Sequence, residues 1–153
     1  MYSKDQASKL KQEFWTTFGQ YLALELSSED LRVNWVNYKT GIKHLYFKMQ
    51  ADQKTASIAI EMAHPDAAIQ ELLFEQFKEF KTILTSYLEE EWDWQLHTVD
   101  EYGKTVTRIS IGITSVNIFK KEDWPTLISF LKPRIMKLDE FWNDAKHSFN
   151  LFS

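Results

Sequence analysis

The chain has 153 residues, of which 44% are hydrophobic and 26% charged, so it is long enough for one domain with a sizeable core. It contains no cysteine, which excludes disulfide frameworks, thiol nucleophiles and cysteine-based metal sites. The net charge of −4 comes from an acidic middle, because residues 49–101 hold twelve acidic residues against three lysines. Such a block argues against a broad nucleic-acid-binding face, which needs clustered cations.

The first predicted element is a helix from Ser3 to about Leu26. Ser3 and Gln6 have the S-x-x-Q spacing of a capping box, in which each side chain satisfies the other's free backbone amide. Apolar residues then recur three or four positions apart, as on one face of an amphipathic helix: Ala7, Leu10, Phe14, Phe18, Tyr21 and Leu22.

Two alternating runs follow, at residues 44–49 and 56–62. Every second residue is apolar in both runs, which is typical of strands with one buried face. The connection between them, residues 50–55, is short and polar, so the two runs are predicted to form a β-hairpin.

A second helix is predicted from Pro65 and Asp66 to about Leu88. Proline is tolerated in the first turn of a helix, and aspartate is favourable at its positive end. The apolar residues between these limits keep helical spacing along one stripe, which indicates a helix that packs on the sheet.

A second hairpin and a last helix complete the pattern. Apolar residues alternate with polar ones over 92–97 and again over 108–113, and Gly103 lies in the turn between these runs. The last helix opens with the Asp-Trp-Pro sequence that starts at residue 123. A proline inside a helix removes one backbone donor, so Pro133 is expected to bend or split this helix.

We therefore predict an α+β fold, one domain spanning residues 1–153, with the element order α-ββ-α-ββ-α. About four antiparallel strands would form one sheet with the helices packed on one face. Residues 54–60 resemble residues 104–111 with one insertion, which indicates either a duplicated ββα unit or a chance likeness of two hairpins. The face under the helices would carry Leu45, Ile58, Ile60, Trp94, Leu96, Ile109 and Ile111.

The same alternation leaves a second sheet face that meets water or a partner. It mixes ionisable residues with very small ones, and Glu61, His97 and Arg108 are the candidate binding residues on it. The simplest interpretation is a solvated face with a cross-strand ion pair between Glu61 and Arg108. A partner surface and a ligand or catalytic site that uses all three residues are the alternatives.

The segment 34–43, between the first helix and the first strand, alternates aromatic residues with amides and lysines. Trp35, Tyr38 and Lys43 are candidate binding residues, because a loop can present stacking and hydrogen-bonding groups together. The favoured alternative is that Trp35 and Tyr38 tuck into the core as a lid, as large aromatic residues beside a sheet usually do.

Motifs for metal, phosphate and nucleophile chemistry are missing from the sequence. The four histidines lack paired metal-ligand spacing, the four isolated glycines form no phosphate-binding loop, and no G-x-S-x-G occurs. We therefore expect no cofactor, no metal site and no catalytic residue. A small enzyme that uses Glu61, His97 and Arg108 stays an alternative.

Residues 34–43 and 56–61 resemble a bacterial family of domains of unknown function. Members of this family, often from Bacteroidetes, occur as short standalone proteins or as the C-terminal part of larger chains with a nuclease-like region. The resemblance covers nearly the whole chain and implies no catalytic residue.

Together, these features predict a cytoplasmic binding or interaction module that self-associates as a homo-oligomer or binds a protein partner. The N-terminal residues show no apolar signal core, and no apolar run is long enough to cross a membrane, so no membrane contact is expected. The alternative is an accessory domain in nucleic-acid processing or defence, which would bind through a local basic and aromatic patch made of Trp35, Tyr38, Lys39, Lys43, Lys48 and Arg108.

Overall fold

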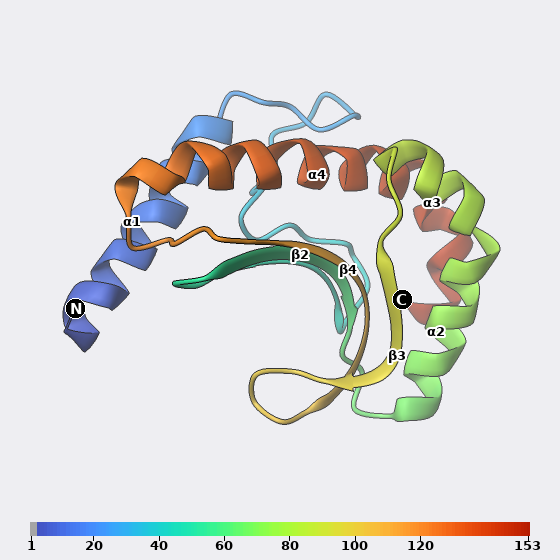
Figure 1. Ribbon diagram of the computed structural model, residues 1–153. Helices are drawn as coiled ribbons and strands as arrows, with labels where there is room; N and C mark the ends of the chain where they lie inside the picture. Colours follow the sequence, from blue (N-terminus) through green and yellow to red (C-terminus); the bar gives the residue numbers. More distant parts are fainter. Residues whose placement is uncertain (1–2) are drawn as a thin grey trace.

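A computed structural model describes residues 3–153, in which a curved four-stranded antiparallel sheet carries its helices on the convex side and at one end (Figure 1). The predicted α+β fold and the order α-ββ-α-ββ-α are confirmed, with one more helix than expected. The predicted domain spans residues 1–153, of which Met1 and Tyr2 lie outside the described residues.

Helix α1 (Lys4–Leu22) begins with the predicted capping box. The Ser3 hydroxyl accepts the Gln6 N–H, and the Gln6 side-chain oxygen accepts the Ser3 N–H. The helix ends before the predicted limit because the chain turns back on itself, so that Leu26 forms an isolated β-bridge with Arg32.

The first hairpin consists of β1 (Leu45–Ala51) and β2 (Thr55–Met62), as predicted. Asp52 holds the turn, because its Oδ1 accepts the backbone N–H groups of Lys54 and Thr55, each at 2.8 Å. An aspartate that bonds to the backbone two and three residues later stabilises a tight turn.

The predicted second helix is two helices, α2 (Ala67–Glu79) and α3 (Lys81–Leu88), so the expectation of one continuous helix is wrong. The Asp66 side chain caps α2 as expected. Phe80 leaves the helical conformation between α2 and α3, with φ −103° and ψ 11°. Its ring packs edge-on against Phe141, with the ring centroids 6.4 Å apart, which indicates that packing on the last helix sets the break.

The second hairpin consists of β3 (Asp93–Val99) and β4 (Thr105–Thr114), and the strand order of the sheet is β1-β2-β4-β3. The register of β3 shifts between Gln95 and Thr98, where β3 contains one extra residue and forms a β-bulge. Leu96 lies in this bulge and is 42% exposed. The prediction that the helices cover Leu96 is therefore wrong.

The last helix, α4 (Trp124–Ala145), follows a short 3-10 turn (Lys121–Asp123) and precedes another (Lys146–Phe152). Pro133 lies inside α4 without interrupting it, so of the two expected effects, a bend or a split, the split is wrong. Pro133 and Ser129, whose carbonyl loses its helical donor, are both exposed. Water can therefore bond to this carbonyl, which lowers the cost of the proline.

The core lies between the convex side of the sheet and the helices. Phe47, Ile60 and Ile109 stand side by side in register across three strands and are buried. Buried side chains of α4, including Leu131 and Trp142, pack against this layer. The helix-facing residues predicted from the alternation are confirmed apart from Leu96.

Candidate functional site

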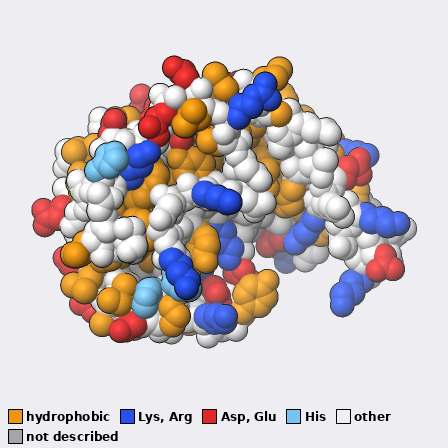
Figure 2. Space-filling model, turned by 180° about the vertical axis from the view of Figure 1, so that it is seen from behind, with side chains coloured by type: hydrophobic (Ala, Val, Ile, Leu, Met, Phe, Trp, Pro, Cys, Tyr) orange, Lys and Arg blue, Asp and Glu red, His pale blue; other side chains and the backbone are white. Residues whose placement is uncertain are grey.

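Within residues 3–153, the concave side of the sheet carries no helix and forms an open hollow. Figure 2 shows this hollow on the lower side of the molecule, with basic, acidic and apolar side chains together on its wall. The first cross-strand row on this side contains Tyr46, Glu61, Arg108 and Gln95 in register. The neighbouring rows consist of shorter or flexible residues: Lys48, Ala59, Ser110 and Asp93, followed by Gln50, Ser57 and Gly112.

Glu61 is the centre of a charged cluster on this face, although only 5% of the residue is exposed. Its Oε1 accepts from Arg108 Nη2 at 3.0 Å, and its Oε2 lies 3.5 Å from Lys48 Nζ. Lys48 Nζ also donates to Glu101 Oε1 at 2.8 Å, which ties the β3–β4 turn to the concave face. The positive charges of Lys48 and Arg108 are thus balanced by the carboxylates of Glu61 and Glu101. The predicted ion pair between Glu61 and Arg108 is observed.

The same contacts shift the pKa values of Glu101 and Lys48. The hydrogen bond from Lys48 lowers the pKa of Glu101 to about 2, with a smaller opposing effect of burial. Partial burial alone would lower the pKa of Lys48, but the hydrogen bond to Glu101 and the charge of Glu61 raise it above its ordinary value. The Nε–H of Arg108 is buried and has no hydrogen-bond acceptor within residues 3–153.

His97 does not join this cluster, contrary to the prediction that it shares the face of Glu61 and Arg108. The bulge turns His97 to the helix side, with φ at 52° and its Nε2 3.0 Å from the carbonyl oxygen of Ala67. Its backbone N–H donates to Thr107 Oγ1 at 3.1 Å. A register slip of one residue moves a side chain to the other face of a sheet, which explains the error.

A buried polar network holds the bulge in place. Thr107 Oγ1 donates to Gln70 Oε1 at 3.0 Å, and Gln70 Nε2 donates to the carbonyl of Thr105 at 2.9 Å. Gln70 belongs to α2, so the bulge forms where this helix packs on the sheet. The alternation of apolar and polar residues in β3 could not predict this bulge, because Gln70 belongs to a different element.

The α1–β1 segment places its two aromatic candidates against the core. Trp35 is buried and donates from Nε1 to the carbonyl of Glu25 at 3.1 Å. The ring of the half-buried Tyr38 stacks on Phe47, with the centroids 5.2 Å apart. This placement agrees with the lid interpretation. The third candidate, Lys43, is exposed in the turn before β1.

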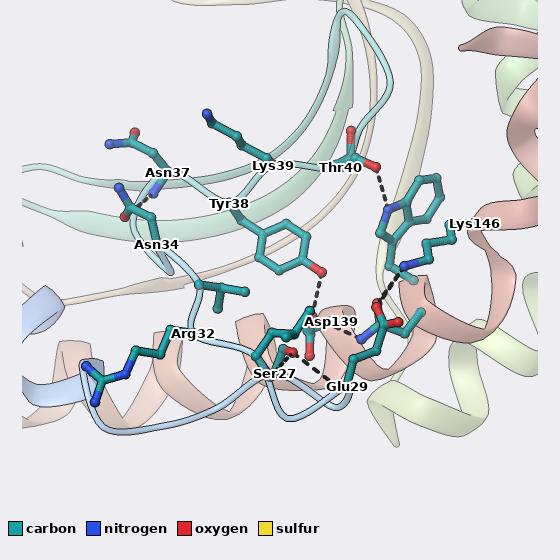
Figure 3. Close-up of a pocket in the computed structure, with 14 residues that line it drawn as sticks. Ser27, Glu29, Arg32, Asn34, Asn37, Tyr38, Lys39, Thr40, Asp139 and Lys146 are labelled. Atoms are coloured by element: carbon teal, nitrogen blue, oxygen red, sulfur yellow. Dashed lines mark hydrogen bonds and ion pairs between the residues drawn. The ribbon is translucent and has the colours of Figure 1, made fainter.

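A polar hollow of about 400 Å³ lies between this segment and the C-terminal half of α4 (Figure 3). The Tyr38 hydroxyl points into it and donates to Asp139 Oδ1 at 2.5 Å. Asp139 Oδ2 accepts the backbone N–H of Ser28 at 2.8 Å. Asp139 is only 2% exposed, and burial together with the Asp139 carboxylate raises the pKa of Tyr38, which therefore stays protonated as a donor.

Asp139 is the residue of this hollow that the sequence interpretation missed. It lies four residues after Ile135 and three before Trp142, which are both buried on the apolar stripe of α4. A carboxylate at a stripe position signals a buried hydrogen-bond partner, because an unpartnered buried charge is very costly. The position of Asp139 on the apolar stripe of α4 could therefore have identified it from the sequence.

No group of three or more histidine or acidic side chains is arranged to hold a metal ion in the described part of the chain. No helix among residues 3–153 is both long and apolar enough to cross a membrane.

Comparison with known proteins adds one match. A family model described as a domain of unknown function, DUF4268, matches residues 10–146. No curated protein and no solved structure matches the chain.

Proposed function

The chain belongs to the DUF4268 family of domains of unknown function, and we propose that it is an interaction module that pairs with a second copy of itself. The observation that carries this proposal is the state of β3 at the edge of the sheet. This strand and the turn after it expose three large apolar side chains: Leu96 at 42%, Val99 at 60% and Tyr102 at 80%.

Strand β3 is an edge strand, with β4 on one side and no strand on the other within residues 3–153. An edge strand presents backbone N–H and C=O groups that can pair with another strand, and exposed apolar residues along it favour such pairing. Proteins that stay monomeric commonly place lysine or proline on such an edge, whereas β3 contains neither residue.

A second copy is the occupant that fits this edge best. Two β3 strands can pair antiparallel about a two-fold axis. Such a contact is self-complementary, because the same patch of each copy forms both halves of the interface. Homodimer contacts are also richer in apolar and aromatic residues than ordinary surface. The bulge at Leu96 bends the first half of β3, so the contact involves mainly Val99 and the adjoining turn with Tyr102.

The nucleic-acid alternative receives less support from the charges. It relies on Lys39, Lys43, Lys48 and Arg108 as a local patch, but Glu61 and Glu101 already pair with Lys48, and Glu61 pairs with Arg108. Cations that are neutralised in this way release few counterions when a phosphate backbone approaches. The link to nuclease-like regions stays a prediction.

The enzyme alternative relied on Glu61, His97 and Arg108 acting together. Glu61 and Arg108 meet on the concave face, while His97 bonds to the start of α2 on the other side of the sheet. We therefore propose binding, and not catalysis, as the role of the domain.

Light scattering on a sizing column tests the proposal. The chain should elute with about twice the mass of 18.2 kDa, and Val99→Glu should shift it to the monomer mass. Leu72→Glu is the matched control, because Leu72 on α2 is 57% exposed and the change of charge is identical. A monomer at all concentrations, or equal behaviour of both variants, contradicts the proposal.

A further inference from the structure

We propose that the outer edge of β1 binds an extended acidic segment of a partner protein, which adds to the sheet as a fifth strand. This edge lies at the opposite end of the sheet from β3, so the contact does not depend on self-association. Three features of the edge support it: backbone groups without partners, hollows that follow the strand, and cations without carboxylate partners.

The hydrogen bonds of the first hairpin show which backbone groups of β1 point away from β2. In an antiparallel pair, residues that face each other alternate between exchanging two hydrogen bonds and exchanging none. The N–H of Ala63 donates to the carbonyl of His44, and the N–H of Asp52 donates to that of Thr55. Both pairs continue the register of β1 with β2, so the even-numbered residues of β1 bond to β2. The odd-numbered residues therefore point their N–H and C=O groups to the outer edge.

The outer edge is paired at its start and unpaired further along. Lys39 forms an isolated antiparallel β-bridge with Tyr46, and the α1–β1 segment has a turn at residues 36–37. Beyond the bridge, the outward N–H and C=O groups of Met49 and Ala51 have no hydrogen-bond partner in the described chain. Ala51 is only 9% exposed, and backbone groups shielded from water are nearly always paired in folded proteins. This edge therefore has unfilled positions for a further strand.

Two hollows follow β1 along this edge. The first, of about 510 Å³, is lined by Val36 and Asn37 of the α1–β1 segment and by Phe47 and Met49 of β1. The second, of about 410 Å³, is lined by the next part of β1, including Ala51. A strand rises about 3.4 Å per residue, so an extended chain of about five residues, roughly 17 Å long, matches the edge from Phe47 to Ala51.

The charges left without partners at these hollows are positive. Lys39 lines the first hollow and Lys11 of α1 lines the second, and neither forms an ion pair in the described chain. In Figure 3 the Lys39 side chain extends away from α4. Three carboxylates also line the hollows, but each is already bonded to the β1–β2 turn or to a cation of the concave face: Asp52, Glu61 and Glu101. Acidic side chains of an added strand therefore meet opposite charge at both ends of the edge.

A partner's extended chain fits this edge better than a second copy of this protein does. Only another extended chain offers backbone donors and acceptors at the spacing of a strand. Two β1 edges would bring like charges together, because β1 itself contains Lys48 and is flanked by Lys39 and Lys11. A contact of β1 with the β3 edge of a second copy is head-to-tail, and such contacts grow into filaments when they do not close into a ring. The occupant is therefore an acidic segment of a different protein.

The experiment begins with a display library of random peptides of about eight residues, selected on the full chain. The enriched peptides should contain aspartate or glutamate well above their share in the library, and synthetic copies should bind with micromolar or tighter affinity in fluorescence anisotropy. N-methylation then tests the strand contact, because it removes single backbone donors. Methylation of every second residue should weaken binding at least about tenfold in one phase of the alternation and much less in the other.

Variants of the chain test whether the contact lies at β1. Lys39→Glu reverses an exposed charge and should weaken binding of the selected peptides about tenfold. Lys43→Glu is the matched control and should leave the affinity unchanged, because Lys43 is an exposed lysine that lines neither hollow. Met49→Pro removes an outward N–H without breaking a bond to β2, and it should abolish binding. Val99→Glu disrupts the proposed β3 contact and should leave peptide binding unchanged.

Four results would overturn the proposal. The first is that no peptide is enriched, or that the enriched peptides are not acidic. The second is that both phases of N-methylation weaken binding equally, which would remove the strand contact. The third is that Lys39→Glu and Lys43→Glu bind the peptides equally well, which would place the contact away from the first hollow. The fourth is that Val99→Glu loses peptide binding, which would place the contact at the β3 edge.

Discussion

Replacing Asp139 by alanine should destabilise the fold more than any other removal of a charge from α4. The carboxylate accepts hydrogen bonds from Tyr38 and from the backbone of Ser28, and it joins α4 to a segment more than a hundred residues earlier. A hydrogen bond to a charged group contributes about 1.5 to 3 kcal/mol, and a buried donor left without a partner costs about 1 to 3 kcal/mol.

The expected loss for Asp139→Ala is about 3 kcal/mol in the free energy of unfolding, because Ser28 is an exposed residue, so water offsets part of the cost of its lost hydrogen bond. For a chain of this length, that loss corresponds to a fall in Tm of roughly 10 °C. Urea unfolding followed by circular dichroism and a thermal melt measure both quantities.

Asp144→Ala is the matched control, since it removes the same charge from the same helix. Asp144 is exposed and accepts a hydrogen bond from Tyr87, so its loss should cost less than about 1 kcal/mol. If both variants lose the same stability, or if Asp139→Ala unfolds like the unmodified chain, the buried role of Asp139 is refuted.

The remaining predictions concern the concave face and α4. Glu61→Ala should cost about 2 kcal/mol in urea unfolding, because it leaves Arg108 without its carboxylate partner and removes one of the two carboxylates that pair with Lys48. A loss below that of Glu101→Ala would contradict this. The pKa of Glu101 is depressed in the fold, so its stabilisation is present above its ordinary value of 4.5 and is lost as the pH falls toward about 2. The stability difference between the unmodified chain and Glu101→Gln should therefore shrink over this interval, and a constant difference would refute the pairing. Pro133→Ala should stabilise the chain by about 1 kcal/mol, since it restores the helical donor to Ser129, and a fall in Tm would count against this.

The sequence predicted the elements of this fold that depend on local patterns. The capping box at Ser3, the two hairpins and the buried row of Phe47, Ile60 and Ile109 follow from spacing within a few residues. Alternation also predicts that Glu61 and Arg108 share one face of the sheet, provided that the two hairpins belong to the same sheet.

The features that the sequence did not predict depend on distant partners. The break at Phe80 involves a ring on α4, and the turning of His97 depends on Gln70 of α2. Asp139 is explained only by Tyr38, which lies 101 residues earlier in the chain. Periodicity within one element carries no information about such contacts, so the bulge and the polar hollow could be found only in three dimensions.

The central claim, pairing of two copies through the β3 edge, is tested most directly by a cysteine cross-link. The chain has no cysteine, so Val99→Cys creates a single thiol at the proposed two-fold contact. A disulfide requires the two Cα atoms to approach within about 7 Å, which only a close symmetric contact allows. Under mild oxidation Val99→Cys should form a covalent dimer rapidly while Leu72→Cys stays monomeric. Equal cross-linking of the two variants, or none at position 99, would contradict the account.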